Sequence, residues 1–238
     1  MSDMPSKSSV SKAGSRIRKY FRGEITQGEY AKALDTLREY RACFAMPTVT
    51  VNMYLRRLLE KQEIDGQVSQ RLKKVPTILE KLTERETTLD LARLHDIGGC
   101  RVVVEDIATV RRLEALIRDD PKNYLVRERD YVSDPRYSGY RAVHLVVNRN
   151  ESLPVEVQLR SRVMHQWAET AEGFSKELGV NFKQDGDHVV QRFLAVASDI
   201  FGRHEVGQAV EPELRARYSE LLPEVEAVLL ERDQLPLF

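Results

Sequence analysis

The chain has 238 residues, of which 42% are hydrophobic and 31% are charged, so it belongs with folded globular proteins and not with disordered or fibrous ones. Its 37 lysines and arginines equal its 37 aspartates and glutamates, which excludes an overall field toward nucleic acid or anionic membranes, so any anion site must be basic locally. Without a signal peptide or a membrane-spanning segment, and with two distant cysteines that suit a reducing compartment, a cytoplasmic protein is expected.

The N-terminal part is predicted to be helical after a short tail. Residues 1–15 are rich in serine and lysine, and this composition predicts disorder. Apolar residues at helical spacing predict helices over Glu29–Phe44 and Val49–Gln62. The same spacing predicts a helix over Val68–Leu82, with a break or restart at Pro76 because an interior proline costs a helix about 3 kcal/mol.

The pattern changes to strands after Gly99. Short β-branched and aromatic runs bounded by turn residues predict four strands: Cys100–Glu105, Tyr124–Val132, Tyr140–Asn148 and Leu153–Arg160. A helical period between the first two allows a crossover, so a mixed sheet is expected. Helical periods predict four more helices: Ile107–Arg118, Arg162–Leu178, Val189–Arg203 and Pro212–Glu231.

These elements predict an α+β fold in one domain over residues 16–238. N-terminal helices would occupy 16–66, a catalytic core 67–180 and C-terminal helices 181–238.

The first segment with chemical character is RLKKVPTILEK, which would place Arg71, Lys73, Lys74 and Lys81 around a helical turn with the hydroxyl of Thr77 between them. Clustered cations neutralise phosphate oxygens, so the segment fits a polyphosphate. A solvated basic helix face is the alternative.

The second segment, LHDIGGCRVVV, sets Asp96 before two glycines and a strand that carries Arg101. A carboxylate at the mouth of a strand suits Mg²⁺, which prefers oxygen ligands. Asp96 could instead cap a turn. His95 and Asp96 also spell the HD pair of metal-dependent hydrolases, but the remaining histidines do not supply the other ligands of that fold, so a hydrolase is not expected.

Two further segments carry polar and aromatic residues on strands. ERDYVSDPRYSGYRAVHLVV combines Arg136, Tyr140 and His144, and aromatic rings beside arginines can hold a base, although the tyrosines of a hairpin can also simply pack. In LPVEVQLR, strict alternation puts Glu156, Gln158 and Arg160 on one strand face. Such a row indicates a cleft or, alternatively, the wet face of an edge strand.

In this order, the four segments resemble the synthetase domain of the RelA/SpoT family, and especially its small single-domain alarmone synthetases. The resemblance runs from about Arg71 to Glu172. It implies a nucleotidyltransferase-like mixed sheet flanked by helices, with ATP and GTP or GDP bound in one cleft. The implied activity is transfer of a diphosphate from ATP to the 3′-hydroxyl of the guanosine nucleotide, without hydrolase activity.

The resemblance also implies roles for individual residues. Arg71 and Arg101 would flank the adenine of ATP, and Lys73, Thr77 and Lys81 would follow its phosphates. Asp96 would hold Mg²⁺ or Mn²⁺, and Glu156 would activate the 3′-hydroxyl and share the metal. The predicted acceptor site consists of Arg136, Tyr140, His144, Gln158 and Arg160, with Tyr140 stacked on the base.

Two alternatives stay open at this stage. The segment MHQWAETAE resembles a branch of the family with toxin relatives, some of which pyrophosphorylate the 3′ end of tRNA. The alternative acceptor is therefore tRNA or an adenosine nucleotide. A degenerate synthetase used as a nucleotide-binding or interaction module is the other, although it would have no reason to keep both Asp96 and Glu156 among cations. A homo-oligomer or an antitoxin partner is compatible with the sequence.

Overall fold

The chain was analysed as a computed structural model that describes residues 4–150, 152–182 and 186–233. Helices and strands follow one another as α1 Lys7–Phe21, α2 Gln27–Ala42, α3 Ala45–Lys61, β1 Gly66–Leu72, α4 Val75–Glu80, η1 Lys81–Arg85, η2 Leu91–Arg93, β2 Gly98–Val104, α5 Ile107–Asp119, β3 Asn123–Asp130, β4 Val143–Arg149, β5 Val155–Ser161, α6 Arg162–Leu178, α7 Val189–Glu205 and α8 Pro212–Asp233. No helix in the described ranges is long and apolar enough to cross a membrane.

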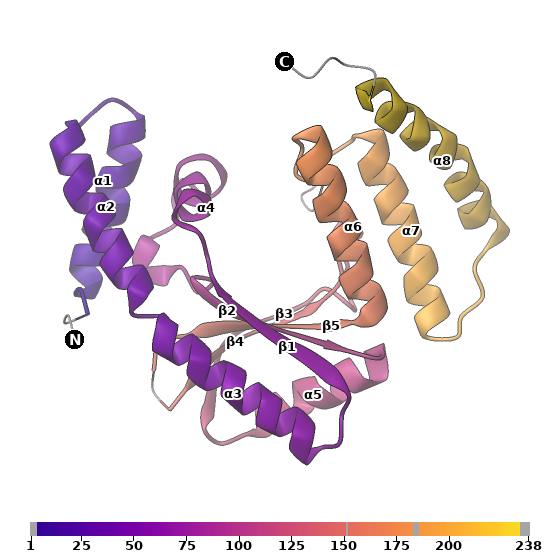
Figure 1. Ribbon diagram of the computed structural model, residues 1–238, viewed down its shortest axis with the longest axis horizontal. Helices are drawn as coiled ribbons and strands as arrows, with labels where there is room; N and C mark the ends of the chain where they lie inside the picture. The colour runs from indigo at the N-terminus through magenta and orange to yellow at the C-terminus, as the bar shows by residue number, and fades with distance from the viewer. Residues whose placement is uncertain (1–3, 151, 183–185, 234–238) are drawn as a thin grey trace. The chain divides into compact units, whose positions relative to one another are not determined.

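The five strands form one mixed sheet in the order β1-β2-β5-β4-β3 (Figure 1). Strand β5 is central, and β1 and β3 are the two edges. Along β5, Val155, Val157 and Leu159 are fully buried. The polar residues of the strand alternate with them, as the sequence predicts, because successive side chains point to opposite faces of a strand.

The chain divides into two compact units, whereas the sequence analysis expects a single domain. Unit 1 comprises residues 1–102, 116–128 and 145–158, and unit 2 comprises residues 103–115, 129–144 and 159–238. In unit 1, α1 packs against α2, and α3 packs against β1 (Figure 1). In unit 2, α7 packs against both α6 and α8.

Each unit has its own hydrophobic core. The core of unit 1 includes Val10, Ile17, Leu37, Ile78 and Leu91. The core of unit 2 is built around Trp167, Phe182, Val190, Leu194 and Val225.

The predicted disordered tail is wrong for residues 7–15, which form the first half of α1. Ser6 caps this helix by accepting a hydrogen bond from the backbone N–H of Ser9. Val10 and Ile17 are fully buried on one face, so a polar composition concealed an amphipathic helix. Residues 1–3 lie outside the described residues.

The predicted helix over Val68–Leu82 is also wrong in its first part. Gly66–Leu72 is strand β1, and a helix begins only at Val75 with Pro76 in its first turn, where a missing N–H costs nothing. The restart expected at the proline is therefore present, but Arg71 lies on a strand and the four cations do not share one helical turn.

The two cysteines, Cys43 and Cys100, are free thiols. Cys100 is buried on β2, and this burial raises the pKa of its thiol to about 12. The thiol is therefore protonated and unreactive at neutral pH.

We predict that Gly14→Ala lowers the free energy of unfolding by about 1–2 kcal/mol, because overpacking outweighs the better helix propensity of alanine. A Cβ at Gly14 would lie 2.7 Å from the Cβ of Leu91. Chemical denaturation measures the effect. The control is Gly28→Ala on α2, where the nearest atom lies 4.0 Å away, and it should be neutral or slightly stabilising. An unchanged stability for Gly14→Ala would mean that α1 is not packed as described.

Candidate functional site

One carboxylate in unit 1 binds two lysines. The Oδ2 atom of Asp96 accepts hydrogen bonds from Lys73 Nζ at 2.6 Å and from Lys81 Nζ at 3.0 Å. We call these three residues the Asp96 cluster. Their side chains are 17–21% exposed, so the ion pairs are mostly shielded from water.

Three segments of unit 1 bring the Asp96 cluster together. Lys73 follows β1, and its backbone N–H donates to the carbonyl of Ile97 at 2.8 Å. The carbonyl of Lys73 accepts a bond from Arg41 Nε at 2.7 Å, which fixes the connection between β1 and α4. Lys81 is the C-cap residue of α4. These backbone bonds place the main chain of Lys73, and the ion pairs with Asp96 orient both ammonium groups.

The charges of the Asp96 cluster shift the pKa of Asp96 and of Lys81. Burial by itself would raise the pKa of the Asp96 carboxyl, but the attraction and hydrogen bonds of Lys73 and Lys81 lower it below its usual 3.8. Burial disfavours the charged form of Lys81, and Asp96 and Glu86 outweigh this, so the pKa of Lys81 is raised. The second oxygen of Asp96, Oδ1, is buried and has no hydrogen-bond partner within the described residues.

The other three residues predicted to contact ATP also lie in unit 1. They do not belong to the Asp96 cluster. Arg71 is exposed near the end of β1, and Thr77 is half-buried in α4. Arg101 is half-buried on β2, between the buried Cys100 and Val102. These placements are compatible with the predicted roles of the three residues, which stay predictions.

The predicted polar row on β5 is present. Glu156 and Gln158 are half-buried and adjacent on one face, and Gln158 Nε2 donates to Glu156 Oε2 at 2.7 Å. This bond orients the carboxylate that the sequence analysis assigns as the base. Gly99 lies on the neighbouring β2, where an added Cβ would make only an ordinary van der Waals contact, 3.7 Å from the carbonyl oxygen of Glu156.

In unit 2, three of the predicted acceptor residues form one hydrogen-bonded group. Arg160 Nη2 donates to the hydroxyl of Tyr140 at 2.8 Å, and that hydroxyl lies 2.7 Å from His144 Nε2. The tautomer of His144 sets which of these two groups donates, because the hydroxyl can accept from Arg160 in either case. Arg160 is only 2% exposed, so this network holds a buried cation.

Tyr140 is buried more deeply than a stacking platform requires. The residue is 7% exposed, and its ring makes edge contacts with the rings of Tyr131, His144 and Trp167. On the same turn, Tyr137 is 71% exposed. The stacking role of Tyr140 stays a prediction, and the structure adds Tyr137 as a competing ring.

Arg136 joins this group through a residue that the sequence analysis did not assign. Arg136 Nη2 donates to the hydroxyl of Tyr131 at 3.1 Å, and its guanidinium carbon lies 4.9 Å from the centre of that ring. Tyr131 also packs edge-on against His144. Its place between a strand and a turn rich in arginine and tyrosine was the available signal.

The structure thus groups the predicted residues within each unit. Unit 1 holds the predicted ATP contacts together with Glu156 and Gln158, and unit 2 holds Arg136, Tyr140, His144 and Arg160. In the described part of the chain, no group of three or more His, Cys, Asp or Glu side chains could enclose a metal ion by itself.

Residues 70–184 match the family described as the region found in RelA / SpoT proteins. The matched residues make up just under half of the chain. The matched segment includes every predicted site residue, from Arg71 to Arg160, and it confirms the resemblance drawn from the four motifs.

Curated relatives match the chain over part of their length. The chain is 31% identical over 116 residues to the probable GTP diphosphokinase RSH3, chloroplastic, of Arabidopsis thaliana, which is 48% of this chain and 16% of that protein. It is 28% identical over 128 residues to the GTP pyrophosphokinase YjbM of Bacillus subtilis, which is 50% of this chain and 58% of that protein. The chain therefore spans well under two thirds of the length of these relatives.

Solved structures share the fold. The small alarmone synthetase 1 from Bacillus subtilis superposes with a TM-score of 0.62 and 22% identity, over 81% of this chain and 99% of that one. A structure of that synthetase bound to its product pppGpp gives a TM-score of 0.60 over 71% of this chain and 93% of that one. The predicted α+β fold with a mixed sheet is confirmed.

We predict that Asp96→Asn lowers the free energy of unfolding by about 1–3 kcal/mol at pH 7, because two shielded lysines lose the carboxylate charge between them. A carboxyl whose pKa is lower in the folded protein than in the unfolded chain stabilises the fold at any pH above its unfolded pKa. This stabilisation is lost as the pH falls through the folded pKa. The difference from wild type should thus be constant at neutral pH and shrink below about pH 3.8. Denaturation at several pH values measures it.

The matched control is Asp35→Asn, which removes an exposed ion pair with Arg38 on α2. That substitution should change stability by less than about 0.5 kcal/mol. A loss of similar size in both variants would mean that the Asp96 cluster is as well solvated as a surface pair.

Proposed function

We propose that the chain is a pyrophosphokinase that transfers a diphosphate from ATP to the 3′-hydroxyl of GDP or GTP and forms (p)ppGpp. The observation that carries this proposal is the Asp96 cluster inside the RelA/SpoT region, where two fixed ammonium groups meet one acidic side chain. Phosphoryl chemistry depends mainly on positioning and charge stabilisation, which this cluster supplies. We limit the proposed activity to synthesis, with no hydrolysis.

In the proposed reaction, the 3′-oxygen of the acceptor attacks the β-phosphorus of ATP. A bond forms between these two atoms, the bond from the β-phosphorus to the oxygen bridging to the α-phosphate breaks, and AMP leaves with that oxygen. The proton of the hydroxyl goes to Glu156, whose carboxylate is oriented by Gln158. Lys73 and Lys81 turn from Asp96 to the phosphates, with Thr77 beside them, and Arg71 and Arg101 hold the adenine.

Asp96 fits a Mg²⁺ or Mn²⁺ ion, with Glu156 as the proposed second ligand. Asp96 Oδ1 is a buried carboxylate oxygen without a hydrogen-bond partner in the described chain, which is the kind of atom that a hard cation satisfies. Magnesium is commonly bound by one or two carboxylates, with phosphates and waters as its other ligands, so a larger acidic cluster is not required. When bound, the ion would neutralise charge on the phosphates.

We assign Arg136, Tyr140, His144, Gln158 and Arg160 to the acceptor. The network of Tyr140 supports this assignment, because a buried arginine and a histidine fix its hydroxyl beside a turn that carries Arg136. A nucleotide phosphate would replace Tyr131 as the partner of Arg136.

The proposal is tested with γ-labelled ATP and four separate acceptors: GDP, GTP, ATP and deacylated tRNA. We expect label to appear in a guanosine product, and chelation of divalent cations to abolish its formation. Label in tRNA or in an adenosine product would replace the guanosine acceptor by the alternative one. No labelled product with any acceptor would overturn the enzymatic proposal in favour of a binding module.

In the same assay, Glu156→Gln should lower kcat by roughly 10²-fold or more while the protein stays folded and binds ATP. The control is Glu60→Gln, the same isosteric change on the exposed side of α3. Near wild-type turnover of a folded Glu156→Gln protein on its best acceptor would refute the assignment of the base.

Two tyrosines on one turn allow the base platform to be assigned. Tyr140→Ala should raise the KM of the acceptor about 5- to 100-fold, with little change in the KM of ATP, because stacking contributes about 1–3 kcal/mol. Tyr137→Ala should raise it less than about threefold, since the bonds to Arg160 and His144 hold the ring of Tyr140 in the proposed acceptor group. The reverse order would place the base on Tyr137. Tyr140→Phe, which keeps the ring, guards against misfolding of the alanine variant.

A further inference from the structure

Helix α7 lies beyond the matched residues 70–184 and is hydrogen-bonded to the turn that carries the proposed acceptor residues. Ser198 on α7 is buried, and its hydroxyl donates to the carbonyl of Gly139 at 2.5 Å. No function assigned above uses this contact.

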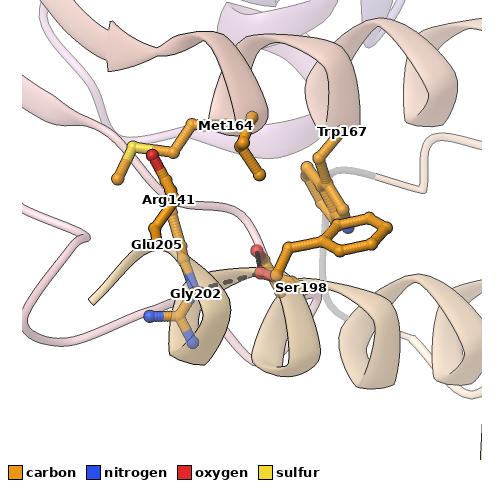
Figure 2. A pocket seen from close by; sticks show the side chains of 9 residues that line it. Arg141, Met164, Trp167, Ser198, Gly202 and Glu205 are labelled. Atoms are coloured by element: carbon orange, nitrogen blue, oxygen red, sulfur yellow. Dashed lines mark hydrogen bonds between the residues drawn. The ribbon is translucent and has the colours of Figure 1, made fainter. Parts of the chain in front are cut away.

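Arg141 makes the second connection to α7. Its Nε donates to Ser198 Oγ at 3.0 Å, and its Nη2 pairs with Asp199 Oδ1 at 2.7 Å. Figure 2 shows a dashed line from the Arg141 side chain to Ser198, in a recess also lined by Trp167 and Glu205. A longer bond of 3.4 Å joins Arg141 Nη1 to the carbonyl of Val132. One guanidinium thus bonds to helix and turn at once.

Helix and turn are also in close steric contact. Gly139 has a φ of +87°, and a Cβ there would lie 2.8 Å from the Cα of Ala195 and 2.9 Å from the Cβ of Ser198. Only glycine combines this backbone conformation with this approach. On the helix side, a Cβ at Gly202 would lie 3.2 Å from the guanidinium carbon of Arg141.

The turn held in this way spans residues 131–142 and is closed at its base. The backbone N–H of Tyr131 donates to the carbonyl of Ala142 at 2.9 Å, and that of Gly139 donates to Arg136 at 2.8 Å. Between these bonds lie Arg136 and Tyr140, both assigned to the acceptor. A shift of Gly139 or Arg141 therefore moves residues that are meant to contact substrate.

We propose that α7 is a clamp on the 131–142 turn, and that Arg141 and Ser198 are positioning residues for the acceptor. The proposal rests on the proposed function, since it takes Arg136 and Tyr140 as acceptor contacts. It predicts that loosening the clamp weakens acceptor binding selectively and leaves ATP binding unchanged.

The chemistry of the clamp supports a positioning role over simple packing. The Arg141 side chain is 18% exposed, and removing a guanidinium from water is costly unless its hydrogen bonds are made with good geometry. Apolar side chains would fill the same space without this cost but would not fix the register of the turn against the helix. Directional bonds from one residue to Ser198 and Asp199 do fix it.

The test compares wild type with Ser198→Ala in three measurements: the Kd of GDP, the Kd of ATP, and hydrogen–deuterium exchange of the peptide covering residues 131–142. Losing the bond to Gly139 should speed exchange of the turn about fivefold and raise the Kd of GDP about five- to tenfold, with the Kd of ATP within twofold. Ser175→Ala is the control, because its hydroxyl also bonds within unit 2, to Ala171 and Phe182, away from the turn.

Unchanged exchange in the turn would overturn the clamp, whatever the activity of the protein. Faster exchange with equal effects on both nucleotides, or with none, would overturn the positioning role. Asp199→Asn is a second variant at a half-exposed site, so it keeps the test open if Ser198→Ala fails to fold, and smaller changes in the same direction are expected. A failure of the proposed function would be seen in a different measurement, the assay with γ-labelled ATP, in which the wild-type protein would form no labelled product.

Discussion

The ion pairs of the Asp96 carboxylate join the segments that carry the candidate site of unit 1. Two ammonium groups within 3.0 Å of one oxygen would repel each other without it, and they come from the connection after β1 and from the end of α4. Asp96 itself immediately precedes Ile97, whose carbonyl bonds to the backbone of Lys73. One charge therefore stabilises the local fold and stores two cations where the proposed reaction needs them.

Most of the secondary structure could be predicted from the sequence, because burial leaves a period in the residues. The four strands β2 to β5 and the helices α5 to α8 are found close to their expected bounds. Strand β1 was missed because Val68, Leu72, Val75, Leu79 and Leu82 follow a helical spacing across what is in fact a strand, a connection and a helix. Helix α1 was missed because serine and lysine on its wet face outweighed its buried residues in composition.

The candidate site was predictable as a set of residues but not as a set of contacts. Asp96 was predicted from its place before a glycine pair, whereas its partners Lys73 and Lys81 lie 23 and 15 positions away, and only the fold joins them. Tyr140 is expected from the sequence to stack on the acceptor base, but Tyr131 of the same segment and Trp167 of α6 pack edge-on against its ring. Alternation along a strand reveals a polar face, and it says nothing about what other elements place over that face.

The bonds from α7 to α6 and to the 131–142 turn join the matched segment to residues beyond its end. Trp167 donates its indole N–H to the carbonyl of Leu194, and the carbonyl of Gly139 accepts a hydrogen bond from the hydroxyl of Ser198. Polar groups of the matched residues 70–184 are therefore paired with residues beyond that range. A fragment cut at residue 184 would lose these partners and uncover the apolar face that meets α7. The matched stretch is thus shorter than the packed unit around it, because residues beyond its end complete its hydrogen bonds and its apolar contacts.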